Sequence, residues 1–301
     1  MIADRKSIKG RIFTMLLTLQ ASLIVTGGAV RLTGSGLGCP TWPQCTPGSY
    51  TPVPHQAEGQ LHAWIEFGNR LLTFLLFFTA LAALILSFRL SKNLSSKKRI
   101  RSLAAFQVIG IFGQAILGGI TVLTDLNPIP VAGHYLLSIA LITGAIKLRY
   151  EIVGNTHQIA TPLIQSIIRI QMVLTILILV IGTVVTGSGP HAGDENAKRF
   201  GFDPQIISWI HADLVIALTS LVLITLLILK NERGPLLKKS KIFLLIILSQ
   251  GAIGYIQYFT GLPELIVGIH LLGSTLVWIA AWSLFEVMQI KLITGKAADN
   301  G

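Results

Sequence analysis

Long uncharged runs of hydrophobic residues recur along the whole chain. Leu71 to Ser87 and Ile170 to Ser188 are two examples, and each approaches the ~20 residues that a helix needs to cross the hydrocarbon core of a bilayer. The pattern predicts eight membrane-spanning helices, over residues 12–30, 61–88, 103–123, 132–148, 167–187, 206–229, 242–260 and 265–288. The first run is long and lacks a small-residue cleavage pattern, so we expect it to be a helix of the mature protein.

The composition and the placement of charge agree with a membrane protein. Only 12% of the residues are charged, against roughly 25% in a soluble domain. A net charge of +11 would suggest nucleic-acid binding in a soluble protein, but here the basic residues gather in alternate connecting segments. These are Arg5, Lys6, Lys9, Arg11, Arg89, Lys92, Lys97, Lys98, Arg99, Arg101, Lys147, Arg149, Lys230, Arg233, Lys238, Lys239 and Lys241. The other segments contain only Arg31, Lys198 and Arg199. The positive-inside rule therefore predicts that both termini are cytoplasmic. The basic residues reflect the orientation of the chain in membrane lipid and do not form a nucleic-acid-binding patch.

The chain also carries an internal repeat. One set of residues recurs with the same spacing in the third and fourth and in the seventh and eighth predicted spans, namely Gln114, Gly118, Thr124, His134 and Ser138 against Gln250, Gly254, Thr260, His270 and Ser274. Each repeat unit has four spans, an even number, so both copies enter the membrane from the same side. The expected fold is all-α, with eight transmembrane helices arranged as two parallel four-helix bundles, residues 1–150 and 151–301, that hold their cofactors inside.

Four histidines fall near the predicted outer ends of even-numbered spans: His62, His134, His211 and His270. One such histidine would most simply be a packed, hydrogen-bonded side chain, but four at a similar depth favour a ligand role, because ionisable groups in spans are costly. Imidazole is a preferred axial ligand of haem iron. We therefore predict that His211 and His270 form a haem-binding pair in the second half.

The first half is less regular. Alignment of the second span with the sixth places Asn69, a poor iron ligand, opposite His211. Either His62, two turns further out, joins His134 as a ligand, or the first site is five-coordinate or held differently. Glu66 lies one turn from both His62 and Arg70. It is either the partner of Arg70 in a structural ion pair or a carboxylate placed beside a haem.

The only two cysteines, Cys39 and Cys45, lie in the first outward-facing segment, in an oxidising compartment where a disulfide can persist. Their spacing permits a bridge without proving one. Such a bridge is either a loop staple or a redox-sensitive or partner-docking thiol pair.

Three segments resemble those of a known family. The segments Gly27-Gly28-Ala29-Val30-Arg31-Leu32-Thr33-Gly34-Ser35-Gly36-Leu37-Gly38-Cys39-Pro40, Trp42-Pro43-Gln44-Cys45 and Ile65-Glu66-Phe67-Gly68-Asn69-Arg70 are similar to those of the haem A synthases, bacterial cell-membrane enzymes of cytochrome oxidase biogenesis. The resemblance extends over nearly the whole chain and looks most like the Gram-positive, actinobacterial branch.

The resemblance implies stepwise oxidation of a methyl group of haem O to the formyl group of haem A, by two hydroxylations and loss of water. It implies a resident haem B on His211 and His270, substrate haem O in the first half, Glu66 as the essential glutamate, and Cys39 and Cys45 as the outer-loop cysteine pair. Haem O synthase and cytochrome oxidase assembly factors are the implied partners. Many members carry histidine where this chain has Asn69, which leaves the second axial ligand of the first site open.

Two rival interpretations remain at this point. A di-haem cytochrome b that only transfers electrons explains the histidines and the repeat, but not Glu66 or the cysteine segment. A transporter or haem-handling chaperone belongs to a different class, and the parallel repeat argues against an alternating-access transporter.

Overall fold

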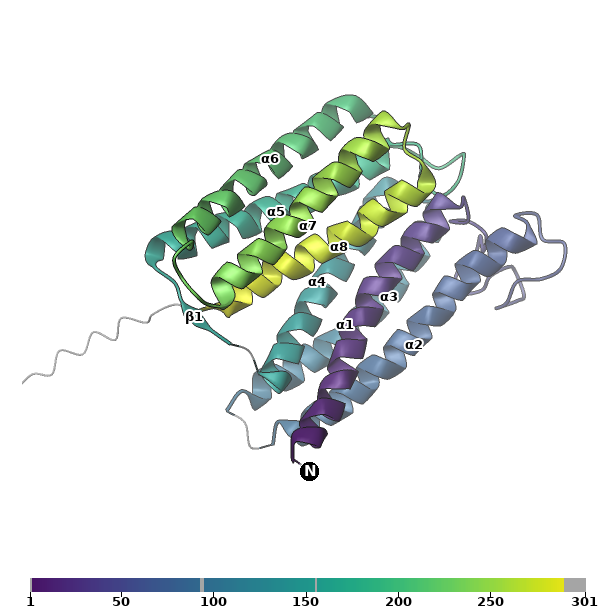
Figure 1. Cartoon of the computed structure of the whole chain (residues 1–301). Coiled ribbons are helices and arrows are strands. Elements are labelled where there is room, and N and C mark those ends of the chain that lie inside the picture. Colours follow the sequence, from purple (N-terminus) through teal and green to yellow (C-terminus); the bar gives the residue numbers. More distant parts are fainter. Residues whose placement is uncertain (1, 93–94, 155, 290–301) are drawn as a thin grey trace, which may run out of the picture.

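The computed structural model describes residues 2–92, 95–154 and 156–289. Eight long helices account for most of this chain (Figure 1). In order, the elements are α1 (Ile2–Leu32), α2 (Gln60–Leu90), α3 (Lys97–Leu123), α4 (Pro128–Val153), β1 (Gln158–Ile159), α5 (Pro162–Ser188), α6 (Pro204–Ile228), α7 (Pro235–Phe259), α8 (Glu264–Val287) and β2 (Met288–Gln289).

All eight helices are long and apolar enough to cross a membrane, so the predicted multi-pass, helical membrane protein is confirmed. All eight helices begin before the predicted spans, mostly at polar ends that a hydropathy pattern does not capture. The helix starts have local causes. Asn127, Thr161 and Asp203 each accept a backbone N–H of the first turn, and each precedes a proline at the first helical position, where proline is well tolerated. The only strands in the described chain are β1 and β2, which form a two-residue parallel pair.

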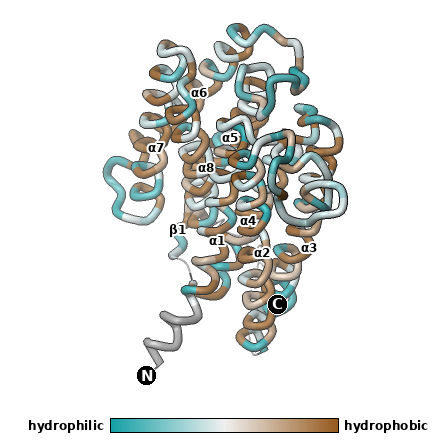
Figure 2. The backbone as a smooth tube through the Cα atoms, turned by 90° about the vertical axis from the view of Figure 1, so that its right-hand side faces the viewer, coloured by the Kyte–Doolittle hydropathy of each residue, from teal (hydrophilic) through white to brown (hydrophobic). Residues whose placement is uncertain are grey.

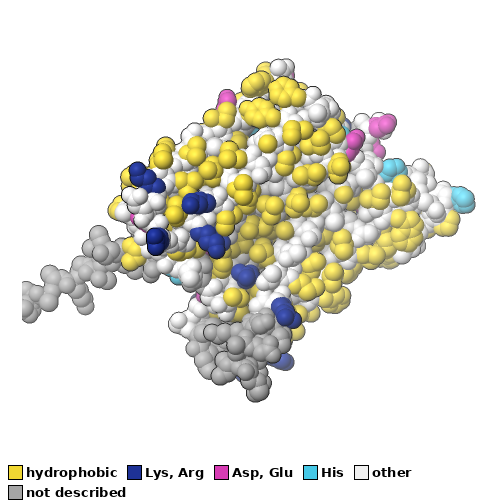
Figure 3. All heavy atoms as spheres, in the orientation of Figure 1, with side chains coloured by type: hydrophobic (Ala, Val, Ile, Leu, Met, Phe, Trp, Pro, Cys, Tyr) yellow, Lys and Arg dark blue, Asp and Glu magenta, His cyan; other side chains and the backbone are white. Residues whose placement is uncertain are grey.

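The surface has the character expected of a membrane protein. Apolar residues follow the helices and polar residues follow the connections (Figure 2). Large hydrophobic side chains such as Phe74, Phe112 and Leu227 are more than half exposed. On the face drawn in Figure 3, apolar side chains cover a broad area, and lysine and arginine side chains gather toward one end. An apolar surface of this extent is suited to lipid and not to water.

The first four helices form one group and the last four a second group beside it (Figure 1). Helices α1 and α4 of the first group pack against α5 and α8 of the second. Two hydrogen bonds cross between α4 and α8, one between the hydroxyls of Tyr135 and Ser274 at 3.0 Å and one from the Trp278 indole N–H to the Thr143 hydroxyl at 2.9 Å. The two groups are therefore joined by specific polar contacts as well as by apolar packing.

The α3–α4 and α7–α8 turns have similar backbone conformations. Asp125 and Leu126 have φ angles of 52° and 56°, and Gly261 and Leu262 have φ angles of 80° and 61°. In both turns the second of these residues donates its N–H to a carbonyl five residues earlier, Leu126 to Thr121 and Leu262 to Gln257, as at a Schellman helix end. This correspondence supports the predicted duplication.

Candidate functional site

Three of the four candidate histidines lie in the same local environment. His134 of α4 packs against Gly118 of α3, and His270 of α8 packs against Gly254 of α7. A Cβ atom on either glycine would lie 3.4 Å from the histidine Cε1. His211 of α6 packs against Gly182 of α5 in the same way, at 3.3 Å. Each imidazole therefore turns the same ring edge toward a glycine on the preceding helix.

The two nitrogens of each ring differ in their surroundings. The Nδ1 atoms of His134, His211 and His270 are buried without a hydrogen-bond partner among the described residues. The Nε2 atoms of the same rings also make no hydrogen bond within the described chain, and they are not fully covered by protein atoms. This leaves Nε2 as the nitrogen that is free to bind a further group. An imidazole with this arrangement fits axial ligation of haem iron.

The three histidines also lie at a similar distance from the start of their helices. They follow the first residue of their helices by six residues (His134 and His270) or seven (His211), which is about 9–10 Å along the axis. His211 on α6 and His270 on α8 belong to helices that both pack against α7, so the predicted second-half pair lies within one group of four helices.

His62 does not share this environment. His62 lies seven residues before Asn69, the residue of α2 that corresponds to His211, and thus about 10 Å further out along the helix. Its Nδ1 lies 2.9 Å from the Ser35 hydroxyl, and the glycine beside its ring, Gly59, belongs to the connecting segment before α2 and not to a neighbouring helix. His62 belongs to the outer edge of the first half.

Asn69 occupies the position in α2 that corresponds to His211 in α6. Its side-chain nitrogen lies 3.9 Å from the Cβ position of Gly27, on α1. Its oxygen accepts a 2.7 Å hydrogen bond from Thr26. The predicted alignment of Asn69 with His211 therefore has a structural counterpart in the helix packing.

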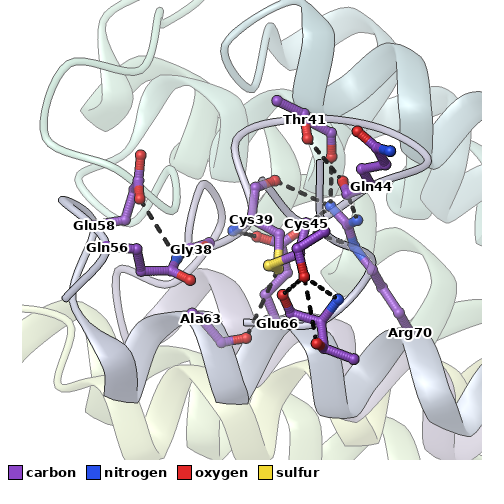
Figure 4. Close-up of a disulfide and its surroundings, with 12 residues drawn as sticks. Gly38, Cys39, Thr41, Gln44, Cys45, Gln56, Glu58, Ala63, Glu66 and Arg70 are labelled. Atoms are coloured by element: carbon purple, nitrogen blue, oxygen red, sulfur yellow. Dashed lines mark hydrogen bonds and ion pairs between the residues drawn. A yellow bond between two sulfur atoms is a disulfide. The ribbon is translucent and has the colours of Figure 1, made fainter. Parts of the chain in front are cut away.

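Glu66 is buried, with 6% of its surface exposed, and both of its carboxylate oxygens are bonded to protein (Figure 4). Oε1 accepts from Arg70 at 2.6 Å, and Oε2 accepts the backbone N–H of Cys39 at 2.7 Å. Arg70 also donates to the carbonyls of Cys39, Thr41 and Gln44. Together, Glu66 and Arg70 fasten the outer segment to α2.

That segment contains the predicted disulfide between Cys39 and Cys45 (Figure 4), and both cysteines are fully buried. The ring of Trp42, between them, packs on Gly119 of α3, where a Cβ atom would come within 2.6 Å. The cross-linked turn is thus held by α2 on one side and by α3 on the other. Within the described residues, no three histidine, cysteine or acidic side chains gather as a metal-binding group.

A sequence model of the COX15-CtaA family, described as cytochrome oxidase assembly proteins, matches residues 10–193. The chain belongs to this family. The match includes the disulfide segment, Glu66 and His134, whereas His211 and His270 lie beyond it.

Several relatives of this family member carry the name "Heme A synthase". The one from Lysinibacillus sphaericus is 30% identical over 152 residues, which are 50% of this chain and 46% of the relative. The one from Geobacillus thermodenitrificans is 27% identical over 105 residues, 35% of this chain and 30% of the relative. A Bacillus cereus protein is 37% identical over 90 residues, 30% of this chain and 26% of the relative. The chain therefore spans about half the length, or less, of the relatives that it matches.

Sequence reasoning on this family member missed three groups of contacts. The repeat includes Gly118 and Gly254, but their packing against histidines is not visible in a spacing. Gly182 gave no signal, because the α5–α6 connection differs in length from the α3–α4 and α7–α8 turns. The Arg70 bonds to backbone carbonyls of the outer segment and the Ser35–His62 contact likewise depend on the folded loop.

Proposed function

We propose that this protein is a haem A synthase, an enzyme that oxidises a methyl group of haem O to the formyl group of haem A for cytochrome oxidase. The observation that carries the proposal is the family match over the first half, which covers the disulfide segment, Glu66 and His134. The names of the relatives agree with it. The three imidazoles with unbonded Nε2 atoms supply iron ligands for such chemistry.

The two halves have separate roles in this proposal. Residues 151–301 hold a resident haem B between His211 and His270, and residues 1–150 take haem O as substrate. His134 is the better supported ligand of the first half, since it shares its environment with the second-half pair. His62 is the alternative mate of His134, and its Nε2 is also unbonded among the described residues.

Bound haem supplies the redox chemistry, and the chain supplies orientation and electrostatics. Glu66 is the proposed catalytic residue. A preorganised carboxylate in a site of low dielectric stabilises positive charge that develops on the substrate methyl carbon, or it positions the water that captures this carbon. In the structure the same carboxylate holds Arg70 and the Cys39 amide, so these contacts keep it in a fixed orientation.

The proposed location is the bacterial cell membrane, with both termini in the cytoplasm and the disulfide segment outside. Haem O synthase, which produces the substrate, and cytochrome oxidase assembly factors, which use the product, are the proposed partners. The asymmetric placement of lysine and arginine supports this orientation.

Mass analysis of haems extracted from cells that express this chain together with a haem O synthase tests the proposal. We expect haem A, or its hydroxylated intermediate, to appear only when this chain is present. Haem B in the purified protein, with haem O untouched, would instead identify an electron-transfer cytochrome. In that case the Glu66–Arg70 pair would be purely structural.

A further inference from the structure

A glycine on each odd-numbered helix packs against a polar side chain of the next helix, in the pairs α1–α2, α3–α4, α5–α6 and α7–α8. Gly27, Gly118, Gly182 and Gly254 lie five or six residues before the last residue of α1, α3, α5 and α7. Each faces a polar side chain of the next helix, namely Asn69, His134, His211 and His270. The four contacts therefore lie at one level, about 8 Å inside the helix ends.

The glycines leave little room for a larger residue. At 3.3–3.4 Å, a Cβ atom at position 118, 182 or 254 would press on the imidazole Cε1 and turn the ring or push it outward. The Nδ1 atoms lie only slightly further away, at 3.8–3.9 Å. Because the Nδ1 edge is held toward the glycine, the Nε2 edge faces away from it.

A polar group on the odd-numbered helix can add to this orientation. In the first pair, the Thr26 hydroxyl contacts both the Leu23 carbonyl, at 3.4 Å, and Asn69. Contacts of this kind at the far side of a ligating histidine fix its tautomer and ring plane.

We propose that Gly118, Gly182 and Gly254 are positioning residues, which set the depth and ring plane of the three iron-ligating histidines. We further propose that Gly27 would hold an imidazole at position 69 in the same way, although this chain has the amide side chain of Asn69 there. The inference rests on the proposed haem binding. It adds that the ligand positions are defined by the glycines of the preceding helices.

The first test compares two alanine variants of one helix. Gly254→Ala places a methyl group against His270, whereas Gly251→Ala, three residues earlier in α7, has nothing within 4 Å of its added Cβ. Both changes raise helix propensity equally. The haem-loaded proteins are compared by optical and electron paramagnetic resonance spectroscopy and by redox titration.

For Gly254→Ala we expect shifted resonance signals, a shifted midpoint potential or partial conversion of the second-half haem to a high-spin form. For Gly251→Ala we expect the wild-type spectra. Equal spectra for the two variants and the wild type would overturn the inference while leaving haem binding intact. A wild-type protein that takes up no haem would overturn the proposed function, and this inference with it.

A second variant keeps the inference testable if Gly254→Ala does not accumulate. Asn69→His should place an imidazole against Gly27 and give the first half a second nitrogen ligand opposite His134. We expect an added low-spin, bis-histidine haem signal that Asn69→Gln, a control of similar size, lacks. If Asn69→His and Asn69→Gln give the same spectra in haem-loaded protein, the Gly27 contact does not define a ligand position.

Discussion

The position of Glu66 suits two different roles, a structural ion pair and a carboxylate that acts on a substrate. Its burial and its bonds to Arg70 and to the Cys39 amide are those of a structural ion pair. Its place one turn inside His62, on the α2 face that carries the outer segment, suits a carboxylate that acts on a substrate. The two roles differ in what the charge does. The structural role needs a hydrogen-bond acceptor and a partner for Arg70, whereas the chemical role needs the negative charge itself.

The variant Glu66→Gln separates these roles. The amide oxygen still accepts the Cys39 N–H, and Arg70 keeps its bonds to three backbone carbonyls. We therefore expect haem content to be retained and the free energy of unfolding to fall by about 1–2 kcal/mol, while haem A production stops. Haem analysis and thermal unfolding in detergent measure the two effects. Full haem A production by Glu66→Gln would remove the catalytic role.

Arg70→Gln provides the comparison, since it leaves the buried carboxylate without its cation. Breaking a buried pair in this way costs about 3–5 kcal/mol, so we expect Arg70→Gln to be the less stable variant. If the losses of activity in both variants follow their losses of stability, Glu66 acts only through the fold.

His134 and His62 are the two candidate iron ligands of the first half. His134 shares its glycine contact and its depth with the second-half pair, and His62 does not. We expect His134→Ala to lose about half of the bound haem of a protein with two haem sites, and His62→Ala to keep its haem content and its optical spectrum. Haem-to-protein ratios of purified variants measure this. An equal loss of haem in both variants would instead make His62 the second ligand.

At the scale of elements, the disulfide turn is a small unit fixed by several kinds of contact. The bridge closes a loop with a sequence separation of 6, and in the chain-entropy account a ring of this size contributes about 2 kcal/mol to stability. Arg70 and the packing of Trp42 on Gly119 hold the turn independently.

We therefore expect Cys45→Ser to lower the unfolding free energy by about 2 kcal/mol without releasing the turn. Thermal unfolding measures the first effect, and limited proteolysis within the outer segment measures the second. Rapid cleavage of Cys45→Ser between residues 39 and 58, under conditions that leave the wild type intact, would show that the bridge alone holds the turn.

The sequence predicts whole helices well and their contacts poorly. All eight spans follow from hydropathy, because a membrane helix must be apolar along its length. The repeat predicts that the α3–α4 and α7–α8 regions are alike, and their backbone angles agree. Hydropathy does not reveal that Gly182 faces His211 or that Arg70 reaches three carbonyls of the outer segment, since both depend on how separate segments pack. Distance from the end of a span is also a weak guide to depth, because α2 begins nine residues before Asn69 and α6 begins seven residues before His211.

At the scale of the whole molecule, the outer connections link the two halves. Arg31, at the end of α1, donates to the carbonyl of His191 in the α5–α6 connection at 2.7 Å, and the Gly36 amide donates to the Gly193 carbonyl. The His191 ring in turn lies 2.8 Å from the Leu262 carbonyl of the α7–α8 turn. One side of the molecule is thus covered by connections that contact one another, and the basic connections lie on the opposite side.

This asymmetry leads to a prediction of orientation. In a chain freed of native cysteines by Cys39→Ser and Cys45→Ser, single cysteines at two exposed positions report the two sides. Glu195→Cys lies in the α5–α6 connection and Lys98→Cys at the start of α3. Because lysine and arginine are retained on the cytoplasmic side, a membrane-impermeant maleimide should label Glu195→Cys in intact cells. It should label Lys98→Cys only after the membrane is opened, and the cysteine-free chain in neither state. The reverse labelling pattern would place the disulfide segment in the reducing cytoplasm, where a bridge between Cys39 and Cys45 would not persist.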